Sequence, residues 1–168
     1  WDVSNVTNMY GMFYKTEKFN GDISNWDVSN VTNMGLIFCR AKKFNGDISK
    51  WDVSSVTDMF KMFSNAENFN GDISNWDVSN VIDMEYMFSD AYNFNQDLSN
   101  WEVGNVLNCS WFSTNANSWA LPKPKFTKET INWRAKAIED ITPYNNEDFL
   151  NKSDSYVEYG EDNDYYRF

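Results

Sequence analysis

The sequence predicts an α/β repeat solenoid, a right-handed parallel stack of about five short coils. Tryptophan returns every 25 residues, and valine, methionine and phenylalanine keep the same register through the copies. No insertion or deletion interrupts the first four copies. A unit of this length is too short to bury a core alone, so each unit is expected to bury its apolar side chains against its neighbours. The right-handed sense follows the general rule for parallel crossovers. The tryptophans of the repeat are Trp1, Trp26, Trp51, Trp76 and Trp101.

Each unit contains one segment with helical spacing and another that alternates. Val6, Met9 and Phe13 recur at the interval of one helix face, so residues 6–16 are expected to form a short helix or 3₁₀ turn. Residues 19–24 alternate apolar or small residues with polar ones, which is typical of a short strand. Stacked coils would then align these strands into a parallel sheet on one side and the helical turns on the other.

The repeated unit reads W-D-V-S-N-V-T-N-M-x-x-M-F-x-x-A-x-x-F-N-G-D-I-S-N and covers residues 1–119, the last copy being degenerate. It resembles the BspA-like leucine-rich repeats of bacterial surface proteins. The 25-residue, tryptophan-containing variant is the one known as a domain of unknown function in mycoplasma lipoproteins. The resemblance implies a leucine-rich-repeat-like solenoid in a surface or secreted protein used for adhesion or interaction. It implies no catalytic residues.

The chain divides into three parts on its composition. Residues 1–119 carry the repeats, and residues 120–142 contain a proline-rich linker followed by helical spacing. We expect this helix to cap the final coil, with docking onto another protein as the alternative. Residues 143–168 form an acidic, tyrosine-rich tail. The first coil begins in mid-pattern, from which we expect either further sequence upstream or a second chain that covers this end.

Composition argues against several classes of function. Histidine is absent, which excludes histidine-dependent triads and imidazole acid–base catalysis. The net charge of −11 disfavours nucleic-acid binding driven by phosphate attraction. No stretch approaches the roughly 20 apolar residues of a membrane span. We therefore expect no enzymatic activity, no cofactor, no nucleic-acid partner and no membrane span in this chain.

Columns of aspartate are the candidate metal site. Carboxylates on adjacent coils would lie about 4.8 Å apart and repel by roughly 0.9 kcal/mol in water. Hydrogen bonds or a cation such as calcium must offset this repulsion. Because the spacing matches neither an EF-hand nor a calcium β-roll, a structural role is favoured, and a calcium-dependent adhesin is the weaker alternative. The calcium column would comprise Asp22, Asp47, Asp72 and Asp97.

Residues that differ between copies are the candidate partner-binding residues, because stacking does not demand them. Aromatic residues make up 18% of the chain, and several fall at such variable positions beside a group of cations. The candidates within the repeats are Tyr10, Tyr14, Phe60, Tyr86, Tyr92, Arg40, Lys42 and Lys43. The aromatic residues of the tail add Tyr165, Tyr166 and Phe168.

The two cysteines fall in different columns, too far apart to form a disulfide with each other. Cys109 occupies a methionine column and is expected to be buried, whereas Cys39 is expected on the more exposed side.

These observations predict a non-enzymatic interaction module on the cell surface or outside the cell, which presents an extended face to a protein or a glycan. A structural subunit or spacer within a capsid, envelope or multiprotein complex is the alternative, and its partner would be a neighbouring subunit.

Overall fold

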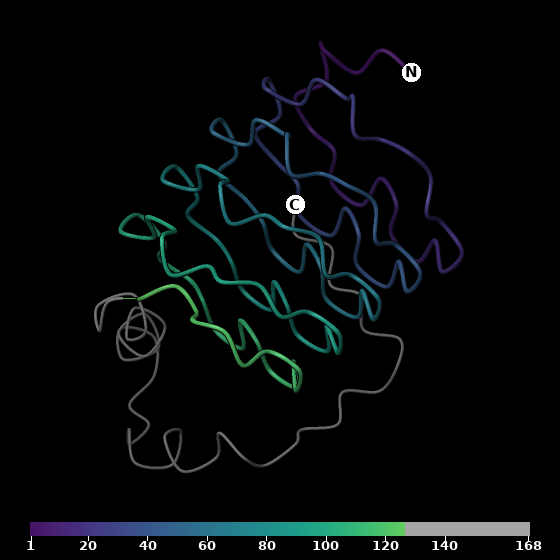
Figure 1. Cartoon of the computed structure of the whole chain (residues 1–168). Helices are drawn as coiled ribbons and strands as arrows, with labels where there is room; N and C mark the ends of the chain where they lie inside the picture. The colour runs from purple at the N-terminus through teal and green to yellow at the C-terminus, as the bar shows by residue number, and fades with distance from the viewer. Residues whose placement is uncertain (127–168) are drawn as a thin grey trace, which may run out of the picture. The chain divides into compact units, whose positions relative to one another are not determined.

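A computed structural model of the chain describes residues 1–126. The chain divides into two compact units, Trp1–Arg134 and Ala135–Phe168, and the described residues belong to the first. Within them, the five copies follow one another in chain order as stacked coils (Figure 1). The helix expected after residue 126 and the tail at residues 143–168 lie outside the described residues.

Residues 1–126 contain neither an α-helix nor a β-strand. Isolated parallel bridges join the coils at one register position, and they connect Asn8 to Asn33, Asn33 to Asp58, Asp58 to Asp83, and Asp83 to Asn108. The strand expected at residues 19–24 is not formed. The Asn20 side chain prevents a strand ladder here, because its amide oxygen accepts the hydrogen bond from the Asn45 backbone N–H at 2.8 Å. A side-chain acceptor there replaces the backbone carbonyl of a sheet ladder.

The helix expected at residues 6–16 is replaced by consecutive tight turns. The N–H groups of Met12 and Tyr14 donate to the carbonyls of Met9 and Gly11 at 3.1 and 2.9 Å, three residues back rather than four. Every second N–H donates instead to the next coil, as from Met9 to the Asn33 carbonyl at 2.9 Å. Since half of the donors serve contacts between coils, an α-helix cannot form.

Two positions in each copy adopt a left-handed backbone conformation. In the first coil they are Gly11 at φ 66° and Lys15 at φ 59°. A positive φ at the third residue is what a type II turn requires, and residues other than glycine adopt it at a cost. The later copies nevertheless place larger residues at both positions. The first position holds Leu36, Lys61, Tyr86 and Trp111, and the second holds Arg40, Asn65, Asp90 and Asn115.

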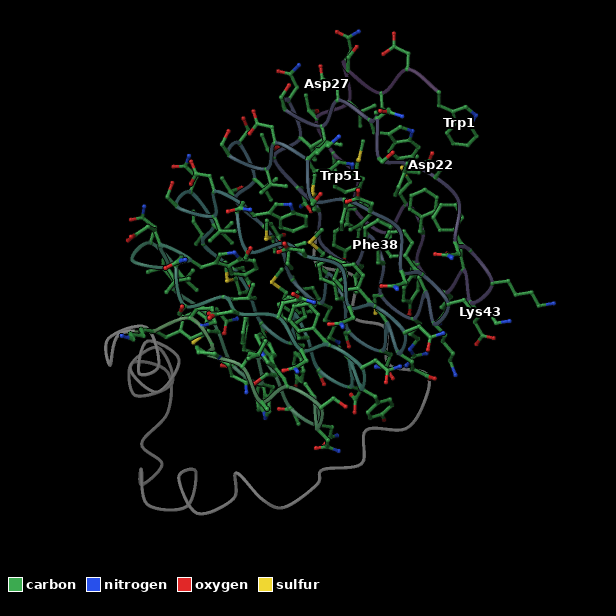
Figure 2. The ribbon with its side chains drawn as sticks, viewed as in Figure 1. Trp1, Asp22, Asp27, Phe38, Lys43 and Trp51 are labelled. Carbon is green, nitrogen blue, oxygen red and sulfur yellow. The ribbon has the colours of Figure 1, made fainter. Side chains whose placement is uncertain are left out.

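Columns of identical side chains fill the core, as the repeat predicts. Phe38 and Phe63 are fully buried, and their rings stack on each other with centroids 5.7 Å apart. Phe38, labelled in Figure 2, also stacks on Phe44 within its own coil, with ring centroids 3.9 Å apart. The buried tryptophans add a hydrogen bond, since the Trp51 indole N–H donates to the Ile23 carbonyl at 3.1 Å. The same bond recurs from Trp76 to Ile48 and from Trp101 to Ile73.

Candidate functional site

The aspartate columns are exposed and take part in local turns. Asp22 Oδ1 accepts hydrogen bonds from the Ser24 hydroxyl at 2.7 Å and from the Ser24 N–H at 3.0 Å. These two bonds, the hydroxyl first, hold the pKa of Asp22 below its usual value, although the neighbouring Asp47 carboxylate pushes it up. The same lowering of the pKa recurs at Asp47, Asp72 and Asp97 in this column, and in the next column at Asp27, which bonds to Ser29, and at Asp77. Figure 2 labels Asp22 and Asp27.

The serine two residues after each aspartate thus donates the hydrogen bonds that offset the repulsion between stacked carboxylates. Within residues 1–126 there is no group of three or more histidine, cysteine, aspartate or glutamate side chains that could hold a metal ion. The local turns therefore account for the positions of Asp22, Asp47, Asp72 and Asp97 without a cation.

Asparagine side chains form a second ladder between the coils. The Asn20 amide oxygen accepts from Asn45 N–H, and Asn45 repeats the contact with Asn70 at 2.9 Å. The series continues through Asn95 to the Ala120 N–H. With their carbonyl oxygens committed between coils, these amides serve the stack.

A row of large side chains lies at the first left-handed position of copies three to five. The rings of Tyr86 and Trp111 stack with centroids 4.8 Å apart and planes 10° from parallel. Lys61 Nζ lies 5.0 Å from the centre of the Tyr86 ring and 5.1 Å from that of Phe60. Trp111 remains 44% exposed in this arrangement. Lys61, Tyr86 and Trp111 occupy this position, and Phe60 precedes Lys61 in the chain. We call these four residues the aromatic row.

The structure gathers only some of the predicted partner-binding residues. In the aromatic row, the Lys61 ammonium group lies over the rings of both Phe60 and Tyr86. Tyr10 and Tyr14 belong to the first coil, where the Tyr10 ring lies over Gly35, and Tyr92 lies beside Asp90 in the fourth. Tyr165, Tyr166 and Phe168 lie outside the described residues. The sequence reasoning missed Lys61 and Trp111, which share the register of Tyr86 at intervals of 25 residues.

Five cations cluster at one corner of the first two coils. We call Lys15, Lys18, Arg40, Lys42 and Lys43 the basic corner. Lys42 pairs with Glu67 at 3.1 Å, and that hydrogen bond raises the pKa of Lys42. The other predicted cations, Arg40 and Lys43, form no ion pair with the part of the chain that the structure describes. Lys43 extends from the outer edge of its coil (Figure 2).

The cysteine expectations are reversed by the structure. Cys39 is 4% exposed, whereas Cys109 is only half-buried, and neither forms a disulfide. Ser64 and Ser89, which occupy the same register in the next two coils, are buried as well, so this position of the repeat faces inward. Partial burial still raises the pKa of Cys109 to about 11.

Comparison with known proteins places the chain in a family. No helix among the described residues has the length and apolar character needed to cross a membrane. Neither the curated proteins nor the solved structures include a significant match. The family described as "Mycoplasma protein of unknown function, DUF285" matches residues 1–81 and again residues 47–153, so its matches overlap along the repeat array. The chain therefore belongs to the DUF285 family.

Proposed function

We propose that this chain is a non-enzymatic interaction module, on the cell surface or secreted, whose coils form a right-handed, BspA-like leucine-rich-repeat solenoid. Its variable side chains, and the aromatic row in particular, contact a protein partner. The stacked coils and the match to a repeat-containing mycoplasma family are compatible with this function.

The observation that carries the proposal is the presence of bulky residues at left-handed positions. Lys61, Tyr86 and Trp111 have φ values of 51°, 55° and 54°, where the first copy has Gly11. A residue with a Cβ costs on the order of 1 kcal/mol in this conformation, and such strain is typically retained at functional positions. Core packing does not require these side chains, because they lie half-buried or exposed on the surface.

The chemistry of the aromatic row suits a protein interface. Aromatic side chains are enriched at interfaces, where their large rigid surfaces bind at a small entropic cost. Tyr86 and Trp111 brace each other by stacking, and Lys61 adds a cation over the Tyr86 ring. The row therefore presents a preorganised apolar surface edged by a positive charge.

Site-specific photocrosslinking tests this function. A benzoylphenylalanine at position 111 would be compared with the same group at Asn75, an exposed position away from the aromatic row. Each protein would be irradiated with intact cells or particles of the source. We expect a discrete crosslinked protein from position 111 that disappears in a Tyr86→Ala, Lys61→Ala background. Equal yields from both positions would refute the proposal, and crosslinks from every face to chains in fixed stoichiometry would favour the structural subunit.

A further inference from the structure

The basic corner combines two features that cost stability. Lys15 and Arg40 occupy the second left-handed position, at φ 59° and 60°. Copies three to five place asparagine or aspartate there, the residues that tolerate this conformation best after glycine. Lys15 and Arg40 therefore retain a backbone strain that the other copies reduce.

Like charges are also stacked between the two coils. The N–H of Lys15 donates to the Cys39 carbonyl at 2.9 Å, which sets Lys15 and Arg40 in the same register on adjacent coils. Lys18 and Lys43 likewise occupy equivalent positions. Side chains at equivalent positions on neighbouring coils are about 5 Å apart at their origins, a separation at which like charges destabilise. The repeat does not impose this arrangement, since Asn65 and Asn68 follow in the third coil.

Carboxylates on neighbouring coils act on Lys42. Glu67 bonds to Lys42, and Glu17 further raises the pKa of Lys42. Within residues 1–126, Lys18, Arg40 and Lys43 form no ion pair. A chain with a net charge of −11 therefore keeps a local positive surface, in which Lys18, Arg40 and Lys43 have no carboxylate partner within residues 1–126.

We propose that the basic corner binds an acidic segment of a partner protein. This inference rests on the proposed function and adds the chemistry of the partner. The planar Arg40 guanidinium suits bidentate recognition of a carboxylate, and the lysines beside it supply point charges.

The corner extends over two coils only, which matches a short run of acidic side chains. Duplex nucleic acid rewards a longer basic surface that neutralises many phosphates. At physiological ionic strength the rest of the chain's negative charge is screened beyond about 8 Å, so the local charge decides the contact.

The test uses the full chain and a fluorescein-labelled oligoglutamate peptide, with binding followed by fluorescence anisotropy at physiological ionic strength. Removal of two charges by Arg40→Gln and Lys43→Gln should weaken binding by about tenfold, a loss expected for two charge-assisted contacts. The matched control, Lys50→Gln with Lys125→Gln, removes the same charge at two exposed positions elsewhere and should leave the affinity unchanged. Equal weakening by both pairs would show that only the total charge matters and would overturn the proposal.

Arg40→Asn separates binding from folding. Asparagine occupies the equivalent position 65 in the next coil, so this variant should raise the urea midpoint while it weakens peptide binding. A purely structural arginine would not change stability and affinity in opposite directions. Unchanged peptide affinity would overturn the proposal.

Other occupants give different results. Tighter binding to a heparin oligosaccharide or to phosphatidylserine vesicles than to the peptide would replace the acidic segment by a glycan or a membrane. Self-association abolished by Arg40→Gln in sedimentation would make a second copy the occupant. If the unsubstituted chain fails to bind the peptide while photocrosslinking from position 111 is intact, the basic corner is ruled out as a binding site and the proposed function stands.

Discussion

Replacement of Trp76 by phenylalanine tests whether the tryptophan column holds adjacent coils together. Trp76 is 4% exposed, and its indole N–H donates to the Ile48 carbonyl at 3.1 Å. Phenylalanine cannot donate this bond, which costs about 1 kcal/mol. Its smaller ring also leaves a gap beside Trp101, which stacks on Trp76 at 6.5 Å, and this adds about 1 kcal/mol. The expected loss is about 2 kcal/mol in the free energy of unfolding.

Urea unfolding followed by far-ultraviolet circular dichroism measures this loss without relying on tryptophan emission. With a slope of about 2 kcal/mol per molar urea, the midpoint should fall by about 1 M. The control is Trp1→Phe, the same chemical change in the same column. Trp1 is 92% exposed, so its replacement should cost less than about 0.5 kcal/mol. Equal losses from the two variants would show that neither burial nor the indole bond matters to the stack.

Two further predictions concern ionisable groups. The serine hydrogen bonds lower the pKa of the stacked aspartates, so their stabilisation is present above the unfolded-state pKa near 3.9 and is lost as the pH falls through the lower folded-state values. The melting temperature should therefore drop more steeply with acidification in the native protein than in Ser74→Ala, and parallel acid profiles would contradict the assigned cause. Burial of Cys39 and the raised pKa of Cys109 predict slow labelling of both thiols by a disulfide reagent at pH 8, and fast labelling of both after unfolding. Rapid native labelling that disappears in Cys39→Ser would place that thiol at the surface.

The sequence allowed the core and the ladders to be predicted, but not the backbone between them. Tryptophan and phenylalanine repeat at fixed intervals because each ring packs against its equivalent one coil away, so Phe38 and Trp51 could be assigned to the core directly. The asparagines also recur every 25 residues, which is the signal for their ladder. The serine partners of the aspartates were present at a spacing of two residues, and that spacing is the signal that identifies the local turn.

The helix and strand were mispredicted for a physical reason. Tight turns that follow one another place Met9 and Phe13 inward at the same interval as a helix face, so periodicity cannot distinguish the two conformations. Glycine would have marked the left-handed positions, but only Gly11 does so. The burial of Cys39 could not be predicted for the same reason. Its orientation depends on the backbone angles of the turn, which the neighbouring residue types do not reveal.

The hydrogen bonds between coils have a consequence for how such genes change. Met9 N–H bonds to the Asn33 carbonyl, and Met34 N–H bonds to the Asp58 carbonyl, so each bond joins atoms at corresponding places in successive copies. An in-frame loss of residues 26–50 would bring Met9 opposite Asp58, which offers the same carbonyl in the same position. Unequal recombination between copies can therefore lengthen, shorten or reorder the array while every junction remains bonded. Whole copies, with the surface residues that they carry, can therefore be gained, lost or exchanged without compensating changes inside the stack.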